Sequence, residues 1–305
     1  MFGVSAFVVV LIAALIFVGI VPGRRSRRTG VEATPRWSKA MVVGGGVVFP
    51  LIVLTILWVW TLADMNALSQ PPGPTRLEVT ITGYQWWWEV QYPRYGITTA
   101  NDIHIPVGQS VRIRIKTFDV NHSLWVPQIT GKTDLIAGRV NSTWWKVDRP
   151  GVYRGQCAEY CGLQHANMIF YVVAQTPTDF RAWVDQERQP AGRPSSSTLA
   201  HGQQVFLSSP CVACHTVRGV STASPGTPLE QFGMNHPTTA ALGPDLTDFG
   251  ARISIGAGAA PNTPGNLGGW IIDSQGIKPG NYMPPIELPA RDLQDLIQWL
   301  ESLRG

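Results

Sequence analysis

The stretch Cys157-Ala-Glu-Tyr-Cys161-Gly-Leu-Gln-His165-Ala-Asn-Met168 places two thiols, an imidazole and a thioether within twelve residues. A further histidine, His122, lies upstream in Asn121-His122-Ser123-Leu124-Trp125. Soft thiolate and thioether ligands combined with imidazole are typical of copper sites. The stretch therefore predicts a copper centre, and the β-rich sequence around it predicts an all-β domain that holds it.

The second cysteine extends this prediction beyond a mononuclear site, which needs one thiolate. Both thiolates can bridge two copper ions, each ion then also binding one histidine, with weak axial ligands completing the set. The expected ligands are the side chains of His122, Cys157, Cys161, His165 and Met168 and the backbone carbonyl of Glu159. A disulfide between the two cysteines is the alternative, but it would leave the neighbouring histidine and methionine without a purpose.

A second cysteine pair, in Cys211-Val-Ala-Cys214-His215, is typical of covalent c-type haem attachment, with His215 on the iron. Met283, in a proline-stiffened Asn-Tyr-Met-Pro-Pro turn, is the expected sixth ligand, and Met234 is its rival. Histidine and methionine together leave no open coordination position, which indicates electron transfer. Zinc is the alternative, but it needs a fourth ligand, and only His201 and His236 remain nearby.

Two uncharged apolar runs indicate a membrane anchor. Only 14% of the 305 residues are charged and 44% are apolar. We expect a hairpin over residues 1–70 with spanning helices at about 2–21 and 41–62, each long enough to cross a bilayer. Positive charge between the runs, as in Arg24–Arg28, predicts a cytoplasmic loop. Both termini and both redox domains would then lie on the periplasmic face of a bacterial inner membrane. The alternative is a pair of buried core helices.

The rest of the chain divides into three predicted parts. Short β-rich segments separated by turns predict a sandwich or barrel over residues 76–175. Residues 176–197 are predicted to form a short helix followed by a flexible linker, Gln189–Ser197. Residues 198–305 form the expected haem domain, whose Gly- and Pro-rich middle would wrap the haem. It ends in an amphipathic helix with apolar residues at helical spacing: Leu293, Leu296, Ile297, Leu300 and Leu303.

The pattern Cys-x-Glu-x-Cys-Gly-x-x-His-x-x-Met, with His-Ser-x-Trp-Val-Pro upstream, closely resembles the dinuclear copper (CuA) domain of cytochrome c oxidase subunit II. The resemblance covers residues 1 to about 187 and includes Gly83-Tyr-Gln-Trp-Trp-Trp88. It implies a cupredoxin-like β-barrel. It also implies that Trp86 is a surface tryptophan through which electrons enter, although core or interface packing would explain this residue equally. The carboxylate of Glu159 is implied to face a magnesium ion shared with the catalytic subunit.

Residues 198–305 resemble a class I cytochrome c, an all-α fold. Gly243-Pro-Asp-Leu246 is similar to the family segment whose proline carbonyl accepts a hydrogen bond from the axial histidine. Pro244 is thereby implied to orient His215. Gly202 and Phe206 are expected to pack against Trp299 where the terminal helices cross.

Together the resemblances imply a caa-type haem–copper oxidase subunit, a redox subunit of an enzyme. It would pass electrons from an external donor, such as a cytochrome c or a quinol–cytochrome c reductase, through haem c and CuA to haem a of subunit I, where oxygen is reduced to water. Implied partners are subunit I, other oxidase subunits and the lipid bilayer. The net charge of +4 is largely one cluster and gives no argument for nucleic acid.

Three alternatives stand beside this interpretation. A quinol oxidase subunit II would lack the copper ligands, and a nitrous oxide reductase would need a large histidine-rich domain. A membrane-anchored copper/haem redox carrier, or a copper-handling protein outside an oxidase, is the third. One departure from the family concerns Glu-x-x-Trp-Thr, whose glutamate helps proton uptake: Glu32 lies five residues before Trp37 and no threonine follows. That role is therefore not carried over to Glu32.

Overall fold

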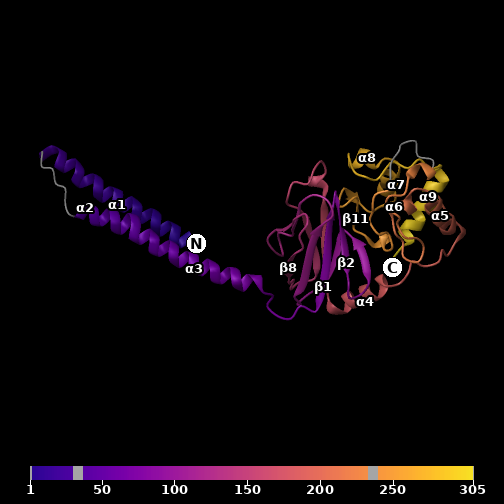
Figure 1. Ribbon diagram of the computed structural model, residues 1–305, viewed down its shortest axis with the longest axis horizontal. Helices are drawn as coiled ribbons and strands as arrows, with labels where there is room; N and C mark the ends of the chain where they lie inside the picture. The colour runs from indigo at the N-terminus through magenta and orange to yellow at the C-terminus, as the bar shows by residue number, and fades with distance from the viewer. Residues whose placement is uncertain (1, 30–36, 233–239, 305) are drawn as a thin grey trace. The chain divides into compact units, whose positions relative to one another are not determined.

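A computed structural model describes residues 2–29, 37–232 and 240–304, which fall into two compact units, Met1–Leu68 and Ser69–Gly305 (Figure 1). Each unit is a separate body. Glu32, Met234 and His236 lie outside the described residues.

The first unit consists of helices. Their bounds are α1 (Phe2–Thr29), α2 (Trp37–Val43), the π-helical segment η1 (Gly44–Val48) and α3 (Phe49–Ser69). Helix α1 continues past residue 21, the end of the predicted span, through Pro22 and Gly23 and the arginines that follow. The π-helical turn lies directly before Pro50, whose missing N–H interrupts the regular hydrogen-bond pattern.

Among the described residues, one helical stretch, Gly44–Met65, is long and apolar enough to cross a membrane. Ser5–Phe17 forms a shorter apolar helical stretch. The second of the two predicted spans thus has a counterpart in the structure, and the complete two-helix hairpin stays a prediction.

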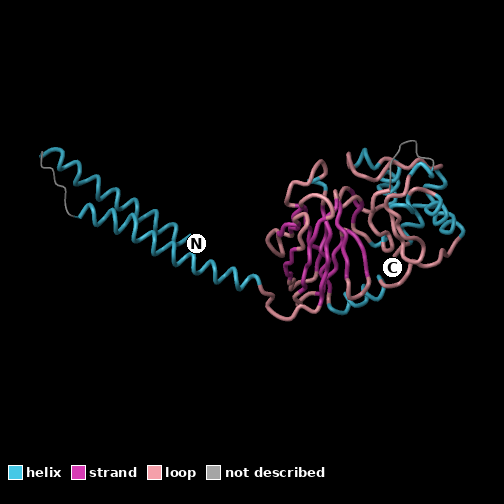
Figure 2. The backbone as a smooth tube through the Cα atoms, viewed as in Figure 1, coloured by secondary structure: helices cyan, strands magenta, loops and turns pink. Residues whose placement is uncertain are grey.

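Two five-stranded sheets form the domain over residues 77–175, named the copper domain after the ligands expected in it, and the all-β prediction is confirmed (Figure 2). The first sheet has the order β3-β2-β1-β5-β8 and the second β4-β10-β9-β6-β7. The strands are β1 (Leu77–Tyr84), β2 (Trp87–Tyr92), β3 (Ile97–Ala100), β4 (Asp102–Pro106), β5 (Val111–Thr117), β6 (His122–Trp125), β7 (Thr133–Leu135), β8 (Asn141–Trp145), β9 (Gly151–Cys157) and β10 (Ile169–Gln175).

Alternation of apolar and charged residues decides which face of each strand turns inward. In β5, Val111, Ile113 and Ile115 are buried while the arginines and lysine between them are exposed. Helix α4 (Pro177–Glu187) then covers the open end of this core with Phe180 and Trp183. The copper domain is therefore a closed apolar body whose loops can hold a rigid site.

The segment after α4 was predicted to be a flexible linker, but the structure attaches it to the haem domain. The backbone N–H of Ala191 donates to the carbonyl of Arg218 at 2.9 Å. The Arg218 guanidinium in turn donates to the carbonyl of Glu187. A polar, proline-rich composition predicts flexibility only when the backbone N–H and C=O groups find no hydrogen-bond partner. Here the haem domain supplies such partners.

The haem domain is helical with one small two-stranded sheet. Its elements are α5 (Ser197–Ser208), α6 (Cys211–Cys214), η3 (Leu229–Phe232), η4 (Phe249–Ala251), β11 (Ser254–Ile255), β12 (Ala260–Pro261), α7 (Pro264–Ile272), α8 (Ser274–Ile277) and α9 (Ala290–Ser302). Helices α5 and α9 cross at Gly202, where Phe206 meets Trp299 with ring centroids 5.0 Å apart.

Candidate metal and haem centres

Strand pairing in the second sheet brings His122 close to the stretch Cys157–Met168, which is named the copper loop. Strands β6 and β9 are paired, with Leu124 opposite Cys157, so His122 at the start of β6 lies beside the end of β9. The chain then loops through the short 3-10 helix η2 (His165–Asn167) and enters β10. The backbone N–H of Cys157 donates to the carbonyl oxygen of Met168 at 2.9 Å, which closes the loop.

The sulfur atoms lie close enough to share a metal. Cys157 Sγ and Cys161 Sγ are 3.8 Å apart, far beyond the ~2.05 Å of a disulfide. Both cysteines are free thiols in this structure. Bonds of ~2.3 Å, the length found for zinc thiolates, reach from both sulfurs to one point between them. Two thiolates at this separation can therefore bridge metal ions.

The other expected ligands surround this sulfur pair. His122 Nδ1 lies 3.9 Å and the Glu159 carbonyl oxygen 3.2 Å from Cys157 Sγ. His165 Nδ1 lies 3.6 Å and Met168 Sδ 3.7 Å from Cys161 Sγ. Within residues 2–29, 37–232 and 240–304, one cluster of three histidine, cysteine or carboxylate side chains could hold a metal, and it is His122, Cys157 and Cys161. The donor set fits copper because it is soft, nitrogen-containing and buried.

Asp119 orients the first histidine, and sequence reasoning missed it. Its Oδ1 lies 2.9 Å from His122 Nε2, which leaves Nδ1 of the ring directed at the sulfur pair. Burial alone would raise the pKa of Asp119, but hydrogen bonds from His122 and two backbone N–H groups lower it. Burial alone would lower the pKa of His122, but its hydrogen bonds to Asp119 and Cys157 raise it. The only sequence signal was a carboxylate three residues before the histidine.

The two thiols are electrostatically unequal. The hydrogen bond between them lowers the pKa of Cys157 and raises that of Cys161. The hydrogen bond therefore favours ionisation of Cys157 over Cys161, and metal binding would require both thiols to lose their protons.

The carboxylate of Glu159 points away from the sulfur pair. Its Oε2 lies 3.5 Å from Lys132 Nζ, and this Nζ is also 3.5 Å from Asp134 Oδ1. All three side chains are about half exposed. The carbonyl and the carboxylate of this one residue therefore face different surroundings. A magnesium ion at the carboxylate would have to compete with the lysine.

Trp86 lies against the copper loop but not on the surface, which fits the alternative of core or interface packing and not the surface position implied by the resemblance. Its indole Nε1 donates to the Cys161 carbonyl at 3.0 Å, and Gln85 Nε2 donates to the same oxygen at 2.7 Å. Only 7% of Trp86 is exposed. Trp86 belongs to the apolar core of the copper domain, and Tyr282 of the haem domain stacks on it with ring centroids 6.0 Å apart and planes 8° from parallel.

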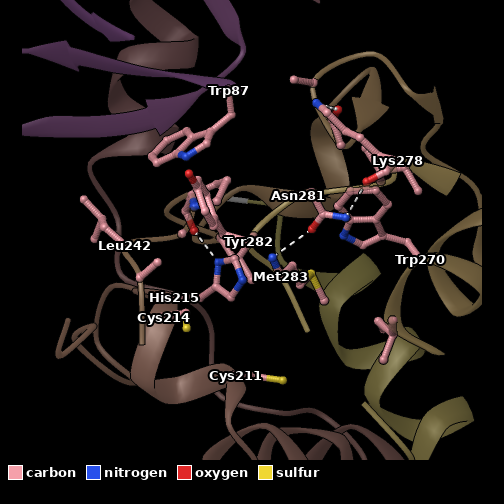
Figure 3. Close-up of a pocket in the computed structure, with 18 of the residues that line it drawn as sticks. Trp87, Cys211, Cys214, His215, Leu242, Trp270, Lys278, Asn281, Tyr282 and Met283 are labelled. Atoms are coloured by element: carbon pink, nitrogen blue, oxygen red, sulfur yellow. Dashed lines mark hydrogen bonds between the residues drawn. The ribbon is translucent and has the colours of Figure 1, made fainter. Parts of the chain in front are cut away.

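A cavity of about 390 Å³ lies within the haem domain and reaches the copper domain. This size is in the range of roughly 300–1,000 Å³ usual for ligand sites. Figure 3 shows His215 and Met283 reaching into it from different segments, with Cys211 and Cys214 at its edge. The lining is mostly apolar and includes Phe206, Leu246, Phe249, Leu267, Ile271 and Leu296. Covalent attachment points on one side and a thioether within the same apolar cavity fit a haem c.

His215 is held in one orientation. Its Nδ1 lies 2.7 Å from the Pro244 carbonyl oxygen, so the ring donates there and keeps Nε2 free as a ligand. Burial lowers the pKa of His215 to about 4, which keeps the imidazole neutral. Gly243 lies flat against the ring: a Cβ there would be 2.5 Å from His215 Cε1.

The segment of Met283 is held by three side chains that the sequence did not reveal. Ser274 Oγ and Gln275 Nε2 donate to the Met283 carbonyl at 2.6 and 3.1 Å. The Met283 backbone N–H donates to Asn281 Oδ1 at 2.8 Å. His201, a candidate for a zinc site, instead lies 2.8 Å from Asp295 in the contact between α5 and α9.

Comparisons with known proteins agree in both domains. The family described as cytochrome C oxidase subunit II, periplasmic domain, matches residues 96–175, and the cytochrome c family matches residues 199–304. A cytochrome c oxidase subunit 2 of Alkalihalophilus pseudofirmus is 34% identical over 99% of this chain and 84% of its own length. One of Bacillus sp. PS3 is 33% identical over 84% of this chain and 72% of its own.

The periplasmic domain of cytochrome oxidase subunit II of Bradyrhizobium japonicum is 29% identical, with a TM-score of 0.37 over 38% of this chain and 96% of that one.

Proposed function

Since this chain belongs to the cytochrome c oxidase subunit 2 family, we propose that it holds a dinuclear copper centre and a covalent haem c as the redox groups of its two domains. The chain is an electron-transfer subunit of a haem–copper oxidase, and its fused cytochrome c domain fits a caa-type enzyme. When bound, copper and haem iron supply one-electron redox chemistry without a substrate. The protein supplies ligands, orientation and exclusion of water.

The observation that carries the copper proposal is the sulfur pair with nitrogen, thioether and carbonyl donors on both sides. The proposed ligands are His122, Cys157, the Glu159 carbonyl, Cys161, His165 and Met168. His122, Met168 and both cysteines are buried. A ligand set that is rigid and dry changes little between oxidation states, which favours rapid electron transfer.

For the haem we propose thioether bonds from Cys211 and Cys214, with His215 and Met283 on the iron. The Pro244 carbonyl orients the histidine, and the α8 side chains hold the backbone of the methionine. The cavity that they share supports this assignment. Ligation by histidine and methionine would leave no open coordination position for oxygen chemistry.

The proposed route is from an external donor to the haem domain and then to the copper domain. It would continue to haem a in subunit I, the proposed site of oxygen reduction. Trp86 is the proposed point where electrons enter the copper domain, because its indole donates to the carbonyl of a copper ligand. The donor would be a cytochrome c or a quinol–cytochrome c reductase.

We also propose the membrane arrangement. Gly44–Met65 and the apolar part of α1 would form the anchor in a bacterial inner membrane, with the arginine-rich segment on the cytoplasmic side. Both redox domains would then face the periplasm. A magnesium ion shared with subunit I would take one carboxylate, Glu159, from this chain, and its other ligands would come from water and the partner.

Metal content of the intact chain tests the proposal. Elemental analysis should give two coppers per covalent haem, together with a near-infrared absorption of the mixed-valence pair. Cys161→Ser should abolish that absorption and leave the haem spectrum unchanged. Tyr160→Phe, an exposed position in the same loop, is the matched control and should keep both. One copper per chain, or zinc, would refute the dinuclear assignment.

A further inference from the structure

Lys278 is a buried lysine at the contact between the haem domain and the copper domain. It follows α8, and only 2% of it is exposed. Its Nζ lies 2.8 Å from the carbonyl oxygen of Trp86, 2.7 Å from that of Asn167 and 2.7 Å from that of Gly256. Three carbonyl oxygens match the three N–H donors of an ammonium group. Two of the acceptors belong to the copper domain and one to the haem domain.

Burying an ammonium group in this position costs free energy of desolvation, so hydrogen bonds must compensate for it. Burial lowers the pKa of Lys278 to about 7, so the ammonium form prevails below that pH, and no ion pair with a carboxylate accompanies it in the described part of the chain. A position that needed only packing would carry a methionine or leucine at lower cost. The gain comes from hydrogen bonds of a charged donor, which are stronger than neutral ones and demand a narrow geometry.

The segment Lys278–Met283 runs from this lysine to the proposed iron ligand. Along it, Gln164 Nε2 of the copper loop donates to the Pro279 carbonyl at 2.7 Å. Tyr282 stacks on Trp86, and its hydroxyl lies 3.2 Å from Gln85 Oε1. Figure 3 shows Lys278, Asn281, Tyr282 and Met283 together along this segment. Every one of these contacts depends on the register between the two domains.

We propose that Lys278 is a positioning residue for electron transfer within the chain: its ammonium group pins the Lys278–Met283 segment of the haem domain onto the copper domain at Trp86 and Asn167. Because the three acceptors lie on separate segments, a shift of the haem domain by about an ångström breaks at least one bond. The consequence for electron transfer rests on the proposed function, whereas the contact itself requires neither copper nor haem.

Hydrogen exchange of the full chain in detergent tests the contact without relying on activity. Two backbone amides report on docking, because Ile169 N–H donates to the Ala257 carbonyl at 2.9 Å and Ile253 N–H to Asp102 Oδ2 at 3.0 Å across the domains. Lys278→Met should lower protection of both amides by at least about tenfold, since a charged donor is lost. Strand β5, inside the copper domain, should keep its protection. Lys146→Met, a partly exposed lysine, is the matched control and should change nothing.

Electron transfer provides the second readout. After rapid reduction of the haem, the first-order reduction of copper should be independent of solvent viscosity in the wild type, because the domains are already docked. In Lys278→Met it should be about tenfold slower and should fall further with added glycerol, while Lys278→Arg, which keeps charge and donors, should recover part of the rate. A wild-type rate that falls with viscosity would overturn the proposal.

Unchanged exchange at Ile169 and Ile253 in Lys278→Met would also overturn the proposal. If this variant lost protection in β5 as well, amine labelling of the wild type decides: Lys278 should react far more slowly than Lys146, and equal reaction would overturn the buried contact. Failure to bind copper or haem would instead refute the proposed function and leave the exchange result intact.

Discussion

The crossing of α5 and α9 at Gly202 offers a quantitative test of how the haem domain is held together. A Cβ at this position would lie 2.0 Å from the backbone oxygen of Asp295 and 2.8 Å from Trp299 Cβ. Ordinary contact begins near 3.4 Å. Gly202→Ala therefore requires the helices to separate by about 1.4 Å, the difference between 3.4 and 2.0 Å, because a helix backbone cannot rotate away.

The expected loss follows from two opposing effects. Overpacking of a dense contact costs about 3 kcal/mol when the obstacle is backbone. Replacing glycine by alanine inside a helix returns up to about 1 kcal/mol. The net loss is about 2 kcal/mol, and for a domain of about 100 residues each kcal/mol lowers Tm by roughly 4–8 °C. We therefore expect the haem domain of Gly202→Ala to unfold at least 8 °C earlier.

Thermal unfolding of the intact chain, followed by circular dichroism and by the haem absorbance, measures this shift. Gly265→Ala is the matched control, because a Cβ there meets nothing within 4 Å. It should leave Tm unchanged or raise it slightly. A Gly202→Ala protein that melts within 2 °C of the wild type would refute the argument, as would an equal loss in the control.

Three further results are expected. Met283→Leu should lower the haem potential in a redox titration and open a site for carbon monoxide, because the thioether favours the ferrous state; an unchanged potential would exclude Met283 as ligand. Gly243→Ala should cost about 1–3 kcal/mol in denaturant unfolding, since its Cβ would displace the His215 ring from Pro244; normal stability would contradict the close approach. Burial raises the pKa of Asp102 to about 6, so its contribution to stability is present below pH 4 and lost as pH rises through 6. Asp102→Asn should abolish this pH dependence and stabilise the chain by about 1–3 kcal/mol at pH 7; denaturant midpoints at pH 4.5 and 7 measure it, and an unchanged slope would contradict the assignment.

Local patterns predicted the elements that depend on local physics. The alternation in Val111–Thr117 corresponds to strand β5, and the apolar spacing after residue 290 corresponds to α9. Helix α7 was missed, because its glycines resemble loop composition. The signal that could have found it was Thr263 before Pro264, an N-cap followed by proline in the first turn.

The candidate sites show the same division. The ligands within one loop could be predicted from the sequence, because a metal binds particular donor atoms at a characteristic spacing. Of the groups that orient those ligands, Asp119 lies three residues before His122, a spacing too common to single it out, whereas Ser274 lies in a different element from Met283. For Trp86 the sequence left surface exposure and packing equally open, because the choice depends on how two domains meet.

The stacking of Tyr282 on Trp86 also shields this indole from other redox proteins. A diffusing redox protein cannot lay its own group against this indole without first lifting the haem domain away. While the domains stay docked, stray oxidants and competing carriers of protein size are kept from Trp86. On the proposed route, the surface of the haem domain would then be the part of this chain that selects the external donor.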